Sequence, residues 1–251
     1  MSAYDFSAPR LHVATDIGLR VAIPLDKAQG NYLGNVLRLS DGDSVLIFNG
    51  RDGEWLARLT QEGRRASHLI PQERTREQPA APDVHYLFAP LKHARLDYVV
   101  QKAVEMGAGV IAPVLTRRTQ VSRVNTERMT ANAVEAAEQC GILAVPEVRE
   151  PVRLADALAQ LEADRLLVFC DEDAPVADAV AALRGADGGG GKARPLALLI
   201  GPEGGFDESE RALILAHPAT VRLSLGPRIL RADTAGVAAL AVMQAVLGDW
   251  R

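Results

Sequence analysis

The sequence contains little cysteine, no long apolar run and no large excess of charge, and each absence excludes a class of protein. Its two cysteines, Cys140 and Cys170, lie far apart and fit neither a disulfide framework nor a paired-cysteine zinc site. We therefore expect a reducing, cytoplasmic location. No segment approaches the roughly 18 uninterrupted apolar residues of a membrane span, and residues 1–10 lack the regions of a secretion signal. Secretion and membrane insertion are not expected.

The charge balance excludes a protein that binds nucleic acid by bulk electrostatics. Lysine and arginine number 28 against 32 aspartate and glutamate residues, so the formal net charge is −4. RNA would be repelled on average, and any contact with it must be local and shaped. What the sequence does have is 48% hydrophobic residues over 251 positions, enough to bury one large core or two modest ones.

The first seventy residues predict a small β-barrel or sheet. Asn49-Gly50 and Asp52-Gly53 supply positions that tolerate positive φ between β-rich runs, which favours hairpins over helices. A polar, proline-containing stretch, Pro71–Asp83, then predicts a linker. We expect one domain at residues 1–72, a linker at 73–83 and a second domain at 84–251. The strands predicted in the first domain are Arg20–Ile23, Ser44–Phe48, Glu54–Leu59 and Ser67–Ile70.

The sequence pattern of residues 84–251 predicts an α/β fold with a parallel sheet. Apolar runs of strand length alternate with helical patterns, and nearly continuous apolar runs are typical of strands covered on both faces. Asp207 followed by Glu210 predicts a capping box at the start of one helix, and Thr234–Leu247 predicts a buried or subunit-facing helix. A first helical stripe consists of Leu96, Val99, Val100, Ala103 and Val104, and the predicted strands are Val84–Ala89, Val110–Leu115, Leu166–Cys170, Leu196–Ile200 and Val221–Leu225.

Two other features carry no expected function. The run Gly188–Gly191 is interpreted as a surface loop because no Lys-Ser or Lys-Thr follows it, as a phosphate-binding loop would require. The five histidines show no metal-ligand spacing, so no metal is expected. They are His12, His68, His85, His93 and His217.

Two loops carry the chemistry. Gly201-Pro202-Glu203-Gly204-Gly205 follows a predicted strand and precedes a capped helix, where glycines allow a ligand to approach the backbone. From spacing alone, a structural Gly-Pro turn explains this segment equally well. Residues 225–235 repeat the arrangement after the next strand, so the two loops could form two walls of one pocket.

Together these motifs resemble the SPOUT superfamily of RNA methyltransferases, specifically the family that methylates N3 of a uridine in 16S ribosomal RNA. The resemblance covers nearly the whole chain. In the first part it lies in Pro9-Arg10, Val36-Leu37-Arg38-Leu39, Gly42-Asp43 and Phe48-Asn49-Gly50; in the second it lies in Leu91-Lys92, residues 97–102, Glu105-Met106-Gly107, residues 135–141, Val145-Pro146 and the two loops.

The resemblance implies a PUA-like RNA-binding domain and a SPOUT domain whose backbone forms a C-terminal trefoil knot, a known exception to the rarity of knots. It also implies a homodimer formed through the second domain, the small ribosomal subunit as partner, and S-adenosylmethionine as cofactor. The residues expected to bind the cofactor are Ile200, Gly201, Gly205, Leu225, Gly226, Ile229 and Leu230, with Leu199, Thr234 and Ala235 as weaker candidates.

Methylation of uracil N3 requires removal of the N3 proton and stabilisation of the resulting anion. Arg231 is the candidate for the anion, since a guanidinium offers paired donors to a carbonyl. Glu203 and Asp233 are candidate proton acceptors, with helix capping as the alternative for each. Phosphate contacts are expected from some exposed arginines, although each also fits a solvated surface. They are Arg10, Arg38, Arg117, Arg118 and Arg123.

The sequence departs from the family pattern at several positions but keeps the residues of both loops that are expected to bind the cofactor. Leu11-His12 replace an aromatic pair, Met129 stands where tryptophan is usual, Ile142 where arginine is frequent, and Asp233 where glutamate is common. Two alternatives remain: a SPOUT enzyme that acts on another RNA such as transfer RNA, and a non-catalytic RNA-binding or ribosome-assembly protein that has kept the fold. Cofactor binding and the identity of the methylated product would distinguish them.

Overall fold

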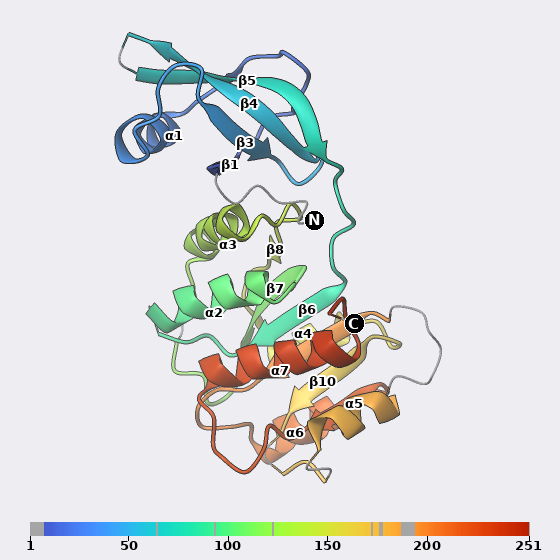
Figure 1. The fold of residues 1–251 in the computed structure, drawn as a ribbon. Helices are drawn as coiled ribbons and strands as arrows, with labels where there is room; N and C mark the ends of the chain where they lie inside the picture. Colours follow the sequence, from blue (N-terminus) through green and yellow to red (C-terminus); the bar gives the residue numbers. More distant parts are fainter. Residues whose placement is uncertain are drawn as a thin grey trace. The chain divides into compact units, whose positions relative to one another are not determined.

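The chain forms two compact units, the first of which is discontinuous in sequence. The computed structural model describes residues 8–63, 65–92, 94–121, 123–171, 173–175, 178–186 and 194–250 (Figure 1). The first unit comprises Met1–Ala80 with Ala137–Val145, and the second comprises Ala81–Ala136 with Pro146–Arg251. Gly188–Gly191 and His93 lie outside the described residues.

The first unit is a five-stranded sheet in the order β1-β3-β4-β5-β2. β1 pairs in parallel with β3, and the other pairs are antiparallel. A short helix, α1, continues directly into a π-helix. The elements are β1 (Arg10–His12), β2 (Ile23–Pro24), α1 (Lys27–Asn31), the π-helix (Tyr32–Val36), β3 (Ser44–Phe48), β4 (Glu54–Glu62) and β5 (Arg65–Arg76).

Two predictions for this unit are wrong in part. Of the predicted strand Arg20–Ile23, only Ile23 is in a strand, because Arg20 has a φ of 59° and its amide donates to the carbonyl of Pro71. The first half of the predicted linker is strand, since β5 continues to Arg76. Pro71 fits there because the β4–β5 register shifts beside it, and a bulge tolerates the missing amide donor.

This unit contains a buried cluster of ion pairs centred on Glu54. Glu54, 2% exposed, accepts hydrogen bonds from Arg10 at 3.1 Å, from Arg76 at 2.5 and 3.0 Å, and from the Thr75 hydroxyl at 3.0 Å. Arg76 also donates to the carbonyl of Gly141, from the second segment of the unit. Arg10 is itself buried, which corrects the expectation that it contacts an RNA phosphate: its guanidinium is already committed to Glu54.

The second unit is built on a parallel sheet in the order β12-β10-β11-β6-β7-β8, with β9 also paired to β7. The α/β fold class expected from the sequence is confirmed, and the β6, β7, β10 and β11 runs are strands as predicted. β12 ends at Leu223, two residues before the predicted end. The strands are β6 (Val84–Phe88), β7 (Val110–Leu115), β8 (Glu147–Val148), β9 (Val152–Arg153), β10 (Leu166–Cys170), β11 (Leu196–Ile200) and β12 (Thr220–Leu223).

Helices cover both faces of this sheet, so its central strands are apolar on both sides. On one face, α4 and α6 pack on a core that includes Leu87, Phe169 and Leu199. On the other, α2, α5 and α7 lie together, with Gly236 against the Tyr86 ring. The helices are α2 (Ala94–Glu105), α3 (Thr126–Cys140), α4 (Leu154–Ala159), α5 (Ala179–Ala186), α6 (Glu208–Leu215) and α7 (Ala232–Val246).

We predict that Glu54→Gln destabilises the first unit by about 3–5 kcal/mol, because buried Arg10 and half-buried Arg76 would lose the charge of Glu54. Urea unfolding followed by Trp55 fluorescence, in a Trp250→Phe background, would measure the loss. Glu62→Gln, on the exposed end of the same strand, is the matched control and should change stability by less than about 0.5 kcal/mol. Equal effects of the two substitutions would contradict the role of the cluster.

The same cluster predicts a pH dependence. Burial of Glu54 raises its pKa, but the hydrogen bonds and charge of Arg76, with the bonds from Thr75 and Arg10, lower it by more, so the pKa lies below its ordinary value. The stability contributed by Glu54 is therefore present above the unfolded pKa and is lost as the pH falls through the folded pKa. In Glu54→Gln this acid-dependent component should be missing from the unfolding free energy.

Candidate functional site

The two glycine loops leave the parallel sheet at the same edge. β11 and β12 flank β10 in the sheet, and all three run in parallel, so their carboxyl ends lie together. The carboxyl edge of a parallel sheet is where α/β proteins bind small ligands. The loop after β11 precedes α6, and the loop after β12 precedes α7.

Glycines give the β11 loop its shape. A Cβ at Gly201 would lie 2.6 Å from the Phe206 ring, which packs edge-on against Phe169. Gly205 has a φ of +68°, and a Cβ there would meet no atom within 4 Å. The first glycine is therefore required by close packing inside the loop, whereas the second has open space beside its backbone.

The loop after β12 is more exposed. Gly226 has a φ of +91° and open space where a Cβ would stand, and Ile229 is 96% exposed. Leu225 and Leu230 are half-buried. An isoleucine presented in full to solvent beside an open glycine lacks a packing role within the unit, so both residues are available to a ligand.

The other residues expected to bind the cofactor divide by burial. Leu199 and Ile200 are buried in β11, and Leu199 packs in the apolar core, so only their backbones can face a ligand. Thr234 is exposed and Ala235 is half-buried in the first turn of α7.

A buried carboxylate lies between the two loops. Asp171 follows β10, and its side chain is 1% exposed. It bonds to Arg211 of α6 at 2.7 Å and to Arg222 of β12 at 2.5 Å. Through these two ion pairs, Asp171 connects α6, which follows one loop, to β12, which precedes the other.

Burial raises the pKa of the neighbouring Cys170 to about 12, with a further increase from the charge of Asp171, so this thiol is protonated at neutral pH.

The three candidate catalytic residues lie on these loops, and the structure adds a fourth charged group. Arg231 is exposed at the N-cap of α7. Glu203 and Asp233 both face Arg95, with nitrogen–oxygen distances of 3.7 and 3.9 Å. Asp233 lies inside the first turn of α7 and accepts the Thr234 amide at 2.8 Å, but the N-cap is Arg231, so Asp233 does not cap this helix. Arg95, in the first turn of α2, lies near the carboxylates of both loops.

Sequence reasoning missed Arg95 and Asp171 for different reasons. Arg95 is a single arginine near the start of a helix and has no partner at a recognisable spacing. Asp171 directly follows a correctly predicted strand at the ligand-binding edge, and that position was the one available signal for it.

Two of the arginines expected to contact RNA also hold the β11 loop. Arg118 donates to the carbonyl of Gly204 at 2.5 Å, and the Arg117 side chain pairs with Asp207 at 2.8 Å. Arg123 is exposed in the same unit, and Arg38 is exposed in the first unit. Among the departures from the family pattern, Leu11 and Met129 are buried, so these two substitutions lie in cores rather than on a contact surface.

Within the described residues, no group of three or more His, Cys, Asp or Glu side chains is arranged to hold a metal ion. No helix in that part of the chain is long and apolar enough to cross a membrane.

Comparison with known proteins identifies the family. A model described as an RNA methyltransferase domain matches residues 77–244, and one described as an RNA methyltransferase PUA domain matches residues 25–72. The chain therefore belongs to the RNA methyltransferase family, and the family resemblance inferred from its motifs is confirmed.

Relatives extend over most of the chain. The ribosomal RNA small subunit methyltransferase E of Synechocystis sp. is 32% identical over 96% of this chain and 78% of its own length, and that of Rickettsia conorii is 29% identical over 84% of each. Among solved structures, the same enzyme from Neisseria gonorrhoeae, bound to S-adenosylmethionine, superposes with a TM-score of 0.82 at 26% identity, covering 97% of this chain and 100% of that one.

We predict that Asp171→Asn destabilises the second unit by about 2–4 kcal/mol, because Arg211 and Arg222 lose the charge that holds them. The unfolding midpoint in urea, followed by circular dichroism, would measure it. Asp173→Asn removes an exposed carboxylate beside the same Arg211 and should cost less than about 1 kcal/mol. A similar loss of stability from both substitutions would contradict the claim that the buried Asp171 contributes more to stability than the exposed Asp173.

Proposed function

We propose that the protein transfers a methyl group from S-adenosylmethionine to N3 of a uridine in 16S ribosomal RNA of the small subunit. One observation supports the proposal: Glu203 and Asp233, one from each loop at the carboxyl edge of the sheet, lie near the same Arg95. The relatives named as small-subunit ribosomal RNA methyltransferases, including one bound to S-adenosylmethionine, support the choice of cofactor and substrate.

The residues present fit the cofactor. Gly205 and Gly226 have positive φ and open space where a side chain would stand, so both loops offer bare backbone to a ligand. Ile229 and Leu230 would supply apolar contact, and Gly201 with Ile200 would place backbone groups at the strand end. When bound, S-adenosylmethionine supplies an electrophilic methyl group on a sulfonium.

The protein's own side chains handle the uracil. Transfer needs the N3 lone pair in line with the methyl carbon, so positioning supplies much of the rate. Arg231 donates hydrogen bonds to a uracil carbonyl and stabilises the anion that forms when N3 loses its proton. Arginine is effectively always protonated, so the acceptor of that proton is Asp233 or Glu203, either directly or through water.

Arg95 fits this scheme as the group that keeps the two carboxylates together. Without a cation between them, Glu203 and Asp233 would repel each other and the RNA backbone. Its contacts of 3.7 and 3.9 Å are long for hydrogen bonds, so its donors are not saturated by either partner.

We assign RNA binding to the first unit together with Arg117, Arg118 and Arg123, and methyl transfer to the second unit with its implied trefoil knot. The homodimer belongs to the same proposal. α7 buries one stripe against the sheet, while Val237, Ala238, Ala241 and Val242 on its remaining surface are half-buried apolar residues that a second subunit could cover.

We predict that the purified protein places one methyl group on 16S RNA when it is incubated with labelled S-adenosylmethionine and small subunits from a strain that lacks the modification. Nucleoside mass spectrometry should identify N3-methyluridine. Cofactor binding without transfer by the wild type would favour another RNA, and no cofactor binding would favour the non-catalytic alternative.

Arg231→Ala should retain cofactor affinity and lose about 100-fold in kcat, because the uracil anion loses its hydrogen-bond donor.

Two glycines of the β11 loop offer a matched pair of substitutions. Gly201→Ala should weaken S-adenosylmethionine binding at least about tenfold, since its Cβ must displace the Phe206 ring. Gly204→Ala places a Cβ 3.4 Å from the flexible Arg118 side chain and should bind the cofactor within about twofold of the wild type. Isothermal titration calorimetry would measure both affinities. Equal affinities of the two variants would contradict the proposal that this loop binds the cofactor.

A further inference from the structure

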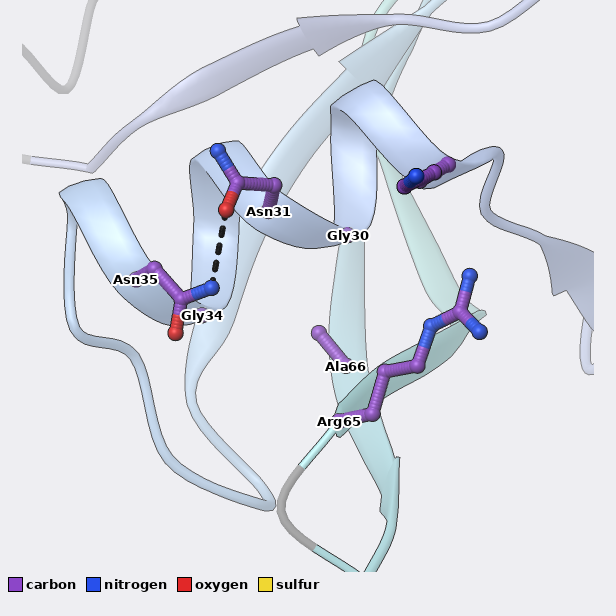
Figure 2. A pocket seen from close by; sticks show the side chains of 7 residues that line it. Gly30, Asn31, Gly34, Asn35, Arg65 and Ala66 are labelled. Carbon is purple, nitrogen blue, oxygen red and sulfur yellow. Dashed lines mark hydrogen bonds between the residues drawn. The ribbon is translucent and has the colours of Figure 1, made fainter.

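The first unit contains a hollow, edged by two cationic side chains, that the proposed site does not use. It has a volume of about 240 Å³ and lies between the α1–π-helix segment and the start of β5. Figure 2 shows Asn31 and Asn35 on the helical side, Arg65 on the strand side, and Ala66 between them. The lining residues are Lys27, Gly30, Asn31, Gly34, Asn35, Arg65 and Ala66.

The floor of the hollow is made of backbone and small side chains. Gly30 and Gly34 are one helical turn apart and face Ala66: a Cβ at Gly30 would lie 2.9 Å from the Ala66 carbonyl oxygen, and one at Gly34 would lie 3.6 Å from its Cβ. Close approach of the helix to β5 therefore requires glycine at position 30. Asn35 lies in the π-helix, a rare conformation that is frequent at functional sites.

The walls are cationic and offer unused donors. Lys27 and Arg65 are exposed and form no ion pair with any residue that the structure describes. The side-chain amide nitrogen of Asn35 donates to the side-chain oxygen, Oδ1, of Asn31 at 2.8 Å. This bond orients the Asn31 side chain and leaves its amide nitrogen with no partner among the described residues. Two exposed cations beside an open hollow can attract an anion with several oxygen atoms.

We propose that this hollow binds the sugar–phosphate backbone of the RNA substrate, with phosphates held by Lys27 and Arg65 beside the Asn31 side chain. The inference rests on the proposed function and adds a contact surface to it. The lining has no aromatic side chain on which a base could stack, so the contact is to the backbone and independent of sequence. In a chain with a net charge of −4, uncommitted cations gathered at one hollow supply the local attraction that RNA binding needs.

The decisive variant is Asn31→Asp in the full-length protein. It keeps the shape of the side chain and the oxygen that accepts the bond from Asn35, but replaces a donor with a negative charge. We expect RNA affinity to fall about three- to tenfold. Gln72→Glu makes the same change of charge on the exposed part of β5 and is the control, with a change below about twofold. Thermal melting of both variants would establish that each is folded.

Lys27→Ala and Arg65→Ala provide a second readout. Binding of a short single-stranded RNA of mixed sequence and of unmethylated small subunits would be measured over a range of salt concentrations, without cofactor. Each variant should lower the slope of log affinity against log salt by about 0.7 to 0.9, as expected for one lost phosphate contact. Arg74→Ala, on the same strand but paired with Glu77, should change this slope by less than half as much.

The outcomes separate this inference from the proposed function. Wild-type transfer to 16S RNA with unchanged RNA binding by the three hollow variants would overturn the inference alone. Weakened RNA binding by these variants in a protein that transfers no methyl group would support the hollow while the proposed function fails. Loss of small-subunit binding with unchanged binding of naked RNA would assign the hollow to a ribosomal protein and overturn the RNA contact. Equal effects of Asn31→Asp and Gln72→Glu would also overturn it.

Discussion

The arrangement of the second unit depends on a single buried carboxylate, Asp171. An isolated charge at this depth would be strongly unfavourable, and it is offset by two guanidinium groups that come from different elements. Arg211 belongs to the helix after the first glycine loop, and Arg222 to the strand before the second. Glycine loops have little stiffness of their own, so their geometry comes from contacts such as Arg118 with Gly204 and from what holds their ends. The ion pairs of Asp171 with Arg211 and Arg222 hold one end of each loop, so the flexible loop backbone is attached to rigid elements.

The sequence was most informative where local physics dominates. The β7, β10 and β11 strands were predicted to the residue, because each is a continuous apolar run that can be satisfied only by burial on both faces. The capping box of α6 was also predicted: the Asp207 carboxylate accepts the Glu210 amide, and the Glu210 carboxylate accepts the Asp207 amide. Both features depend on neighbours within a few positions, and the spacing of those neighbours is visible in the chain.

Prediction failed where a side chain found its partner across the fold. Arg10 belongs to a family motif and was expected at a surface, yet it pairs with Glu54, 44 positions away. Nothing in its local sequence distinguishes a buried arginine from an exposed one. Arg20 and Pro71 were misread for a related reason, since the hydrogen bond between their backbones turns one segment out of a strand that its composition favoured. The candidate site itself could be placed on two loops, but the charges that organise it could not.

The division of the first unit into Met1–Ala80 and Ala137–Val145 has a consequence for how the protein is made. The half-buried Arg76 donates to the carbonyl of Gly141, and the His12 amide donates to Glu138 at 2.7 Å. During synthesis on a ribosome, the β strands emerge well before these partners exist, so the N-terminal unit cannot complete its structure as soon as its sheet is translated. Its last bonds form only when residues 81–136 of the second unit have also been made. A fragment ending at residue 80 would lack these contacts permanently, and the two units are thereby linked in the order of their folding.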